Sequence, residues 1–374
     1  MKELSGTNKR KIVILTNNAS GLISFREELL RKLAESDNVL VVLPPSEYTA
    51  VIERTGCHVY PVDLDRRGMN PIHDLKLYRA YRQILKREHP DAVITYTVKP
   101  NVYGGRACAA LKIPYLCNIT GLGTAIENGG LLSHLTLRLY RIGLKHAACV
   151  FFQNEDNLSF FRQRRVVSGK TRLIPGSGVN LEHHRFEEYP SEEDGYRFLF
   201  VGRVMRDKGV RELLEAFRTI HSSHLNVMLH MIGSFDEDYQ ALIKQAEADG
   251  FLRYHGIQKD VHRFYQSCHC VVLPSYHEGM ANVLLEAAST GRPVIATRVP
   301  GCKETFDEDC TGYGCEAKNT NSLVDALEHF LSGSEDIHRK MGKKARDKMC
   351  REFNREIVIR TYLEELENAE YGSK

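Results

Sequence analysis

Short runs of aliphatic residues alternate along this chain with longer stretches in which apolar and polar residues mix. The first series of runs is rich in Val, Ile, Leu and Cys and is bounded by polar residues, glycine or proline, which predicts buried parallel strands. These runs lie at 11–16, 39–43, 57–62, 91–97, 115–119 and 149–153. A second series lies at 196–202, 226–232, 251–256, 268–273 and 294–296.

The stretches between these runs repeat apolar residues at helical spacing. In the first half they are 22–35, 46–54, 72–88, 101–111 and 131–146. Strands that alternate with helices in this way predict a parallel, doubly wound α/β sheet. Because there are two series, the sequence predicts two Rossmann-like domains.

The segment from Ile174 to Asn180 contains Pro175, Gly176 and Gly178, and separates the two series. A cluster of glycine and proline between two periodic segments is typical of a linker. We therefore expect a first domain at residues 1–175 and a second at 176–353, sizes typical of single domains. The amphipathic stretch from Arg351 to Asn368 predicts a long final helix.

The most informative stretch runs from Pro274 to Thr297. It reads as a strand exit, a polar turn at Gly279, a helix from Ala281 to Thr290 and a further strand. The N–H groups of Gly279 to Val283 open this helix, and a helix N-terminus attracts anions such as phosphate. Glu278 and Glu286 lie eight residues apart on either side of these groups. Carboxylates repel an anion but accept bonds from hydroxyls, so a nucleotide sugar suits both features. The alternative interpretation is purely structural: an ordinary exposed glutamate and a glutamate that complements the positive end of the helix dipole would give the same spacing.

Two other strand exits have turns that suit phosphate. Gly202 and Arg203 follow one strand, and Lys208 and Gly209 open the next helix. Arg offers a planar donor fork and Lys a point charge, although a solvated basic loop would look the same. Residues 17–21, ending in Gly21, follow the first strand but do not form a dinucleotide fingerprint. The acidic run at 236–238 is expected to open a helix, where the helix dipole explains it.

Composition narrows the class of protein. The chain has 374 residues, 42% hydrophobic and 26% charged, as in soluble globular proteins. Its ten cysteines are scattered, which favours reduced thiols over disulfides or zinc. The polar first residues lead into a strand and no run reaches the roughly 18 apolar residues of a membrane span, so we expect neither a signal peptide nor a transmembrane helix.

Charge is unevenly distributed although the net charge is only +3. Residues 1–175 contain 26 Lys and Arg against 15 Asp and Glu, while the remainder is acidic overall. The first half is therefore expected to face something anionic. Nucleic acid is disfavoured, because the basic residues lack interleaved aromatic stacking platforms.

The two glutamates resemble the Glu-x7-Glu signature of retaining GT-B glycosyltransferases of family 4, and Gly202 to Gly209 fits that family's Gly-Arg-x4-Lys-Gly diphosphate clamp. Ala281 departs from the family pattern, where proline is common. The resemblance implies two Rossmann-like domains facing across a cleft, with the last helix (about 354–374) crossing back onto the first domain. It implies catalytic roles for Glu278, Arg203 and Lys208, and donor binding by a wider set. That set is Gly21, Gly202, Arg203, Lys208, Ile257, Glu278, Gly279, Met280, Ala281, Asn282 and Glu286.

The stretches 95–105 and 118–130 are less generic and resemble the bacterial branch that extends polyprenyl-diphosphate-linked sugars. This branch includes enzymes that add N-acetylgalactosamine, α1,3, to a diacetylbacillosamine on undecaprenyl diphosphate. Lys99, Asn118, Thr120 and Glu127 are candidate acceptor-side residues. A histidine that many members carry near Thr120 is missing here.

The resulting hypothesis is a retaining glycosyltransferase that uses a UDP-sugar and needs no metal or other cofactor. It would act on a polyprenyl-diphosphate-linked sugar at the cytoplasmic face of the membrane. Leu131 to His146 combines leucines with Arg138, Arg141 and Lys145, as in an interfacial helix, but also as in a core helix with a basic edge. The helix at 72–88 and the pair Arg66 and Arg67 add further cations. Alternatives are another UDP-sugar or a soluble acceptor, a GT-B-fold UDP-sugar epimerase, and a catalytically silent binding module.

Overall fold

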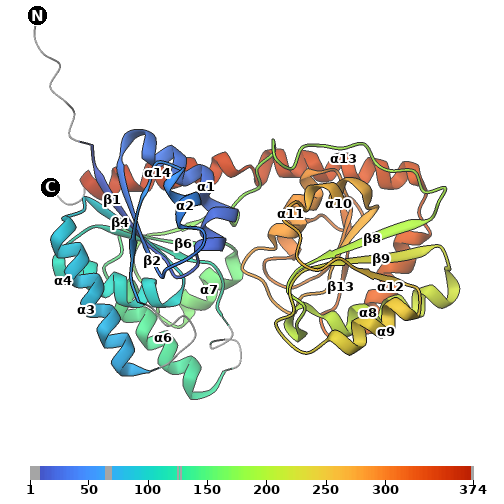
Figure 1. The fold of residues 1–374 in the computed structure, drawn as a ribbon, viewed down its shortest axis with the longest axis horizontal. Helices are drawn as coiled ribbons and strands as arrows, with labels where there is room; N and C mark the ends of the chain where they lie inside the picture. The colour runs from blue at the N-terminus through green and yellow to red at the C-terminus, as the bar shows by residue number, and fades with distance from the viewer. Residues whose placement is uncertain (1–8, 64–69, 124–125, 127–128, 372–374) are drawn as a thin grey trace, which may run out of the picture. The chain divides into compact units, whose positions relative to one another are not determined.

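The computed structural model describes residues 9–63, 70–123, 126 and 129–371. The chain forms two compact units, each with its own sheet (Figure 1). Unit 1 comprises Met1–Ser177 and Glu356–Lys374, and unit 2 comprises Gly178–Arg355. The chain passes from unit 1 to unit 2 after Ser177 and back to unit 1 after Arg355.

Unit 1 contains a parallel seven-stranded sheet in the order β3-β2-β1-β4-β5-β6-β7. Its strands are β1 (Lys11–Leu15), β2 (Asn38–Leu43), β3 (His58–Pro61), β4 (Ala92–Tyr96), β5 (Tyr115–Ile119), β6 (Cys149–Phe152) and β7 (Thr171–Leu173). Its helices are α1 (Ala19–Ser36), α2 (Thr49–Glu53), α3 (Pro71–Glu88), the π turn η1 (Pro100–Gly104), α4 (Gly105–Leu111), α6 (Gly130–Leu144), α7 (Glu155–Gln163) and α14 (Arg355–Tyr371). The strand order reverses between β1 and β4, which makes their carboxyl ends the topological switch point.

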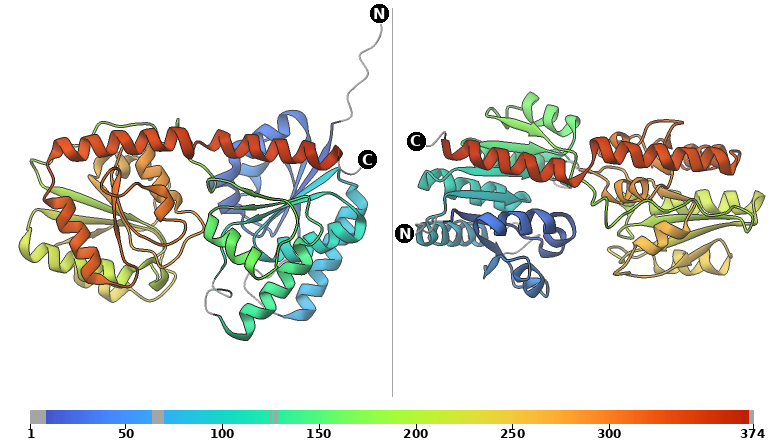
Figure 2. Two further views of the ribbon diagram at one scale, coloured as in Figure 1. Left: turned by 180° about the vertical axis from the view of Figure 1, so that it is seen from behind. Right: turned by 90° about the horizontal axis from the view of Figure 1, so that it is seen from above.

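Helices cover both faces of this sheet, so its strands are buried on both sides. One apolar core joins the sheet to α3, α4, α6 and α7, and a second joins it to α1 and α14. Val358, Ile359, Tyr362 and Leu366 of α14 pack in the second core, so the final helix belongs to unit 1 although it follows unit 2 in sequence (Figure 2).

Unit 2 contains a parallel six-stranded sheet in the order β10-β9-β8-β11-β12-β13. The strands are β8 (Tyr196–Val201), β9 (Val227–Ile232), β10 (Leu252–Tyr254), β11 (Cys270–Leu273), β12 (Val294–Thr297) and β13 (Gly312–Cys315). The helices are η2 (Arg206–Lys208), α8 (Val210–Ser223), α9 (Gln240–Ala248), α10 (His262–Ser267), α11 (Asn282–Ser289), η3 (Lys303–Thr305), α12 (Thr320–Leu331) and α13 (Glu335–Glu352). Here the strand order reverses between β8 and β11.

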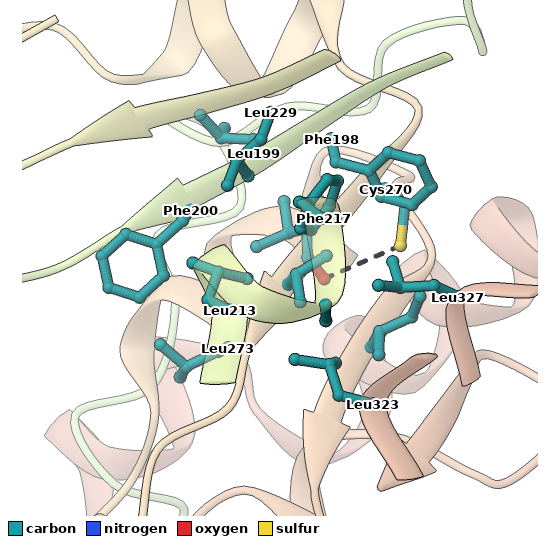
Figure 3. Close-up of a cluster of buried hydrophobic side chains, with 14 of the residues drawn as sticks. Phe198, Leu199, Phe200, Leu213, Phe217, Leu229, Cys270, Leu273, Leu323 and Leu327 are labelled. Carbon is teal, nitrogen blue, oxygen red and sulfur yellow. Dashed lines mark hydrogen bonds between the residues drawn. The ribbon is translucent and has the colours of Figure 1, made fainter. Parts of the chain in front are cut away.

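The core of unit 2 is continuous across this sheet. Figure 3 shows Phe198 of β8 and Phe217 of α8 close to Leu323 and Leu327 of α12, and all four side chains are at most 1% exposed. Burying each such aromatic or leucine side chain contributes about 1.5–3 kcal/mol. The core thus holds β8 and β11 side by side, which fixes the two turns that follow them.

Two doubly wound, Rossmann-like sheets confirm the fold class expected from the alternation of strands and helices. The short edge strands β7 and β13 were not predicted. The expected long final helix is present as α14, but it begins at Arg355 rather than at Arg351, because Phe353 and Asn354 separate it from α13. Val179 pairs with Asn354 as an isolated parallel bridge, which uses the backbone at this break. No helix among the residues that the structure describes is long and apolar enough to cross a membrane.

Candidate active site

The carboxyl ends of β8 and β11 lie next to each other at the switch point of unit 2, where α/β sheets bind ligands. The turn after β8 carries Arg203 and Lys208, and the turn after β11 carries Glu278. The two turns touch. Gly209 has φ +67°, and a Cβ atom built on it would lie 2.1 Å from the carbonyl oxygen of Pro274. Only glycine allows this approach.

Lys208 and Glu278 form an ion pair between these two turns. Lys208 Nζ donates to Glu278 Oε1, which also accepts a bond from Ser275 Oγ at 2.8 Å. The side chains are 20% and 14% exposed, so both still reach the surface. The structure therefore brings together the cation and one of the carboxylates that were predicted from separate motifs.

Arg203 is not a free cation in this structure. Its NH1 atom donates to Asp236 Oδ2 at 2.8 Å, and the backbone N–H of Arg206 donates to Glu237 Oε2 at 2.9 Å. The expectation that residues 236–238 open a helix is wrong, because α9 begins only at Gln240. Asp236 and Glu237 instead hold the basic turn after β8 in place.

The turn after β11 leads into α11, whose N-cap is Ala281. The expectation that the N–H groups from Gly279 to Val283 are all available to a ligand is wrong in part. The N–H of Ala281 donates to the carbonyl of Gly301 at 2.8 Å, and that of Asn282 to the carbonyl of Met280 at 3.0 Å. Met280 and Ala281 are buried, at 6% and 2% exposure. The buried Asn282 Oδ1 has no hydrogen-bond partner among the described residues, so a donor group of a ligand could bind to this oxygen.

Glu286 lies on α11 and is held by a partner that was not predicted. Tyr265 Oη donates to Glu286 Oε2 at 2.8 Å, while His184 Nε2 lies 3.9 Å from Oε1. Burial raises the pKa of Glu286 to about 7, although the Tyr265 bond and Arg355 act in the opposite direction. Burial and the neighbouring His183, His262 and Arg355 lower the pKa of His184 to about 3. Glu286 is therefore poised to change charge near neutral pH while His184 stays neutral.

The predicted nucleobase loop follows β10. Gly256 has φ +64°, and Ile257 after it is 76% exposed. An exposed aliphatic side chain next to a glycine can pack against a planar ring. Among the described residues, no hydrogen bond or ion pair connects Ile257 to the turns after β8 and β11. Its role stays a prediction.

We expected Gly21 to lie in the loop after β1. It lies instead in the first turn of α1, which begins at Ala19. Its N–H donates to the N-cap side chain, Asn18 Oδ1, at 3.0 Å. A Cβ atom at Gly21 would lie 2.4 Å from Asn18 Nδ2. This glycine therefore fits the helix cap closely, and its N–H is already used.

The acceptor-side candidates fall into different environments. Asn118 is fully buried, and its Nδ2 donates to Tyr362 Oη of α14, so the expected acceptor contact is wrong and the residue anchors α14. Thr120 is exposed directly after β5, and Lys99 lies after β4 in an ion pair with Asp74. Glu127, like Arg66 and Arg67, lies outside the described residues.

Ser275, Asp236, Tyr265 and Asp74 each bind a predicted residue but were not predicted to do so. Nothing in the sequence linked Asp236 to Arg203 or Tyr265 to Glu286, because each pair meets only through the fold. Ser275 stands three residues before Glu278, and this spacing could have suggested the bond. Among the residues that the structure describes, no group of three or more His, Cys, Asp or Glu side chains could hold a metal ion.

Comparisons with known families agree with this architecture. Residues 20–176 match the glycosyl transferase 4-like domain, and residues 183–348 match the glycosyl transferases group 1 family. The first match covers the sheet of unit 1 except β1, and the second covers the whole sheet of unit 2 with both switch-point turns.

Individual relatives are similar over nearly the full length. The chain is 26% identical over 371 residues to the N,N'-diacetylbacillosaminyl-diphospho-undecaprenol α-1,3-N-acetylgalactosaminyltransferase of Campylobacter jejuni, covering 94% of this chain and 97% of the relative. It is 28% identical to the capsular polysaccharide biosynthesis glycosyltransferase CapM of Staphylococcus aureus, covering 92% and 93%.

Among solved structures, sucrose-phosphate synthase from Thermosynechococcus elongatus superposes with a TM-score of 0.82 at 20% identity, covering 98% of this chain and all of that one. Anabaena HepE in complex with UDP-glucose gives a TM-score of 0.77 at 17% identity, covering 96% and 99%. These similarities support the fold. The chain thus has the GT-B fold, with a glycosyl transferase 4-like domain followed by a glycosyl transferases group 1 domain.

Proposed function

We propose that this protein transfers a sugar from a UDP-sugar to a polyprenyl-diphosphate-linked sugar, with retention of the anomeric configuration. Our specific proposal is α1,3 transfer of N-acetylgalactosamine to an undecaprenyl-diphosphate-linked sugar in bacterial glycan assembly. The name of the Campylobacter relative describes this reaction for that protein. Anabaena HepE was solved with UDP-glucose, which supports a UDP-sugar as the donor class.

The observation that carries the proposal is the Lys208–Glu278 pair at the β8/β11 switch point, with Arg203 on the same turn as Lys208. A cation aimed at the leaving diphosphate stabilises charge that grows as the sugar–phosphate bond breaks. The carboxylate beside it accepts bonds from sugar hydroxyls. Within the described residues, bonds to Glu278 are made only by its Oε1 atom, which leaves Oε2 for the donor sugar.

Retention follows if the acceptor hydroxyl attacks C1 on the face that the diphosphate leaves. The bond between C1 and the acceptor oxygen forms, the bond between C1 and the phosphate oxygen breaks, and the acceptor proton passes to the departing diphosphate. No separate base is needed. Glu286, in the second turn of α11, holds the ribose hydroxyls.

We further propose that no metal ion takes part. Lys208 and Arg203 supply positive charge for the diphosphate, a role that metal ions fill in other transferases. Asp236 and Glu278 hold these two cations in the structure and release them when phosphate oxygens take their place.

The acceptor class implies contact with an anionic membrane surface, which we assign to α3 and α6 of unit 1. Both helices pack against α4 and the preceding π turn. Each exposes aliphatic side chains: Ile72 at 65% and Leu75 at 48% on α3, and Leu131 at 91%, Leu135 at 51% and Ile142 at 49% on α6. Exposed cations accompany them, namely Lys76, Arg79, Arg82 and Lys86 on α3, Arg138 on α6 and Lys145 directly after α6. An amphipathic surface of this composition binds at the interface of anionic lipids.

One experiment tests the proposal. The protein is incubated with a panel of UDP-sugars and detergent-solubilised polyprenyl-diphosphate sugars, and the product linkage and anomeric configuration are determined by NMR. The expected product carries a new α-linked sugar and UDP is released. Interconversion of UDP-sugars without acceptor would support a GT-B-fold epimerase, and product of inverted configuration would contradict retention.

A further inference from the structure

Three polar side chains of unit 1 form a cluster that lies outside the donor site. Lys99 Nζ lies 2.8 Å from Asp74 Oδ1, and Tyr103 Oη donates to Asp74 Oδ2 at 2.7 Å. The side chains of Lys99 and Asp74 are 13% and 16% exposed, so the cluster is shielded but reaches the surface. We call these three residues the Asp74 cluster.

The cluster stands at the edge of the sheet where ligands bind. Lys99 follows β4, one of the two strands that flank the switch point of unit 1. Asp74 lies in the first turn of α3, the helix that comes after β3 and leads to β4. Because helix N-termini and strand carboxyl ends meet at the same edge of a doubly wound sheet, both residues are on the ligand-binding edge.

The backbone that carries Lys99 and Tyr103 is unusual. Thr97 has φ +72°, a conformation that β-branched residues rarely adopt, and Pro100–Gly104 form a turn of π-helix. Buried bonds from Thr95 Oγ1 to Asn101 Oδ1 (2.6 Å) and from Asn101 Nδ2 to the carbonyl of Asn118 (2.8 Å) hold this turn. Strained backbone and π turns occur frequently at functional sites, where the surrounding structure maintains them.

The chemistry of the cluster suits a sugar better than a phosphate. A carboxylate offers about four acceptor positions and an ammonium three donors, and the bonds above use two and one of these. Burial and the bond to Asp74 raise the pKa of Tyr103, so its hydroxyl stays protonated and donates. Donors and acceptors therefore stand side by side, and the charges of Lys99 and Asp74 balance, although Arg106 adds a positive charge near Tyr103. The Asp74 carboxylate itself would repel an anion. A buried ion pair is by itself weak evidence for a role in stability, and this one stands at the ligand-binding edge with unused donors and acceptors, so we consider a role in binding.

We propose that Asp74, Lys99 and Tyr103 bind hydroxyl and acetamido groups of the sugar at the acceptor end that receives the transferred residue. This inference rests on the proposed function, since it requires that the acceptor be a sugar. It assigns acceptor specificity to Asp74 and Tyr103, which sequence alone did not single out.

The first test is steady-state kinetics of Asp74→Asn and Tyr103→Phe. Both substitutions preserve shape, and Tyr78→Phe on the same helix α3 is the matched control, because it also removes one phenol hydroxyl. Loss of a charge-assisted bond should raise the KM for the acceptor about 10-fold or more in Asp74→Asn, and less in Tyr103→Phe. The KM for the UDP-sugar should change less than twofold in each. An unchanged acceptor KM in both variants, or an equal rise in both KM values, would overturn the inference.

The second test measures binding without turnover, by calorimetric titration. The probes are an N-acetylhexosamine linked through diphosphate to a short isoprenoid, and the same isoprenoid diphosphate without the sugar. Asp74→Asn should lower the affinity for the first probe to that for the second, and leave the second unchanged. Equal losses for both probes would assign the cluster to diphosphate instead and overturn the inference, as would an absence of any binding by the wild type. If the wild type transfers no sugar but its binding still depends on Asp74, only the proposed function fails.

Discussion

Lys208 and Glu278 are seventy residues apart in sequence, yet Lys208 Nζ donates directly to Glu278 Oε1. One residue follows β8 and the other β11, so the pair exists only because these strands are neighbours at the switch point of their sheet. Ser275 holds the same carboxylate oxygen. The cation and the carboxylate that we assign to diphosphate and sugar thus hold each other until the donor binds.

Replacing Lys208 by alanine should reduce turnover by about 10²-fold or more, because its charge acts most strongly as the diphosphate departs. Affinity for the UDP-sugar should fall much less, since Arg203 and the turn remain. Lys244→Ala, on the exposed face of α9 in the same unit, is the matched control. Steady-state kinetics with calorimetric UDP titration measures both effects. Wild-type turnover in Lys208→Ala would remove this residue from the site.

The two glutamates should differ in their kinetic signatures. Glu286→Gln keeps the size of the side chain but loses charge-assisted bonding to the ribose, which is about 1.5–3 kcal/mol per bond. We therefore expect a raised KM for the donor with a modest change in kcat. Glu278→Gln should mainly lower kcat, because it acts at the transferred sugar and beside Lys208. If both variants changed KM and kcat in the same proportion, this division of roles would be incorrect.

The raised pKa of Glu286 predicts that the free energy of unfolding depends on pH. Its value of about 7 in the folded protein lies above the ordinary 4.5. Burial of the protonated Glu286 side chain therefore contributes fully to the free energy of unfolding below pH 4.5. This contribution, about 3 kcal/mol, is lost as the pH rises to 7. Urea unfolding at several pH values should show this loss in the wild type relative to Glu286→Gln.

Two further variants sharpen that experiment. Tyr265→Phe removes a bond that lowers the pKa of Glu286, so the pH at which the loss ends should move upward. Glu316→Gln, at a side chain that is 65% exposed, controls for the loss of a carboxylate in general. A difference between wild type and Glu286→Gln that did not vary with pH would show that Glu286 ionises normally.

The fold and the centre of the candidate site could be predicted because their signals are local. Alternating strands and helices predict two doubly wound sheets, and Lys208 and Glu278 each lie in a motif of fewer than ten residues. Short edge strands such as β7 have only three residues, too few to show a period. The break at Phe353 and Asn354 lacks glycine and proline, and depends instead on the bridge to Val179.

Apart from Ser275, the partners of the site residues could not be predicted, since each comes from elsewhere in the chain. Asp236 reaches Arg203 from the loop after β9, and Tyr265 reaches Glu286 from α10. Asn118 was misassigned for a related reason. A strand residue near a ligand-binding edge can point into the core, and Asn118 does so to meet Tyr362, 244 residues later in sequence.

Transfer should proceed at an undiminished rate in excess EDTA, because Lys208 and Arg203 neutralise the diphosphate in our proposal. The rate of UDP release with and without chelator measures this directly. The Lys208→Ala variant is informative here as well, since added magnesium should not restore its turnover. Activity that disappears with EDTA and returns with magnesium or manganese would refute a metal-free site.

The membrane surface on α3 and α6 gives the last prediction, and the structure changes how it is tested. Arg141 looked in sequence like a third interfacial cation of α6. Its guanidinium instead donates to the carbonyls of Arg165 at 2.9 Å and Arg164 at 2.8 Å, so replacing it would disturb the fold. Arg138 of α6 and Lys145, the residue directly after this helix, are exposed and are the better targets.

The double variant Arg138→Gln/Lys145→Gln should lose about 1 kcal/mol of attraction per cation near an anionic surface, or about 2 kcal/mol in all. Binding to phosphatidylglycerol vesicles should then weaken about 30-fold, and wild-type binding should weaken as salt rises, because exposed charges are screened beyond about 8 Å. Lys343→Gln/Lys344→Gln on the exposed side of α13 in unit 2 is the matched control. Co-sedimentation with these vesicles, beside neutral phosphatidylcholine ones, measures binding.

Transfer to a water-soluble acceptor should survive in the double variant, while transfer to the polyprenyl acceptor in vesicles drops. Equal recovery of wild type and both variants with acidic vesicles would leave α6 as an ordinary core helix with a basic edge.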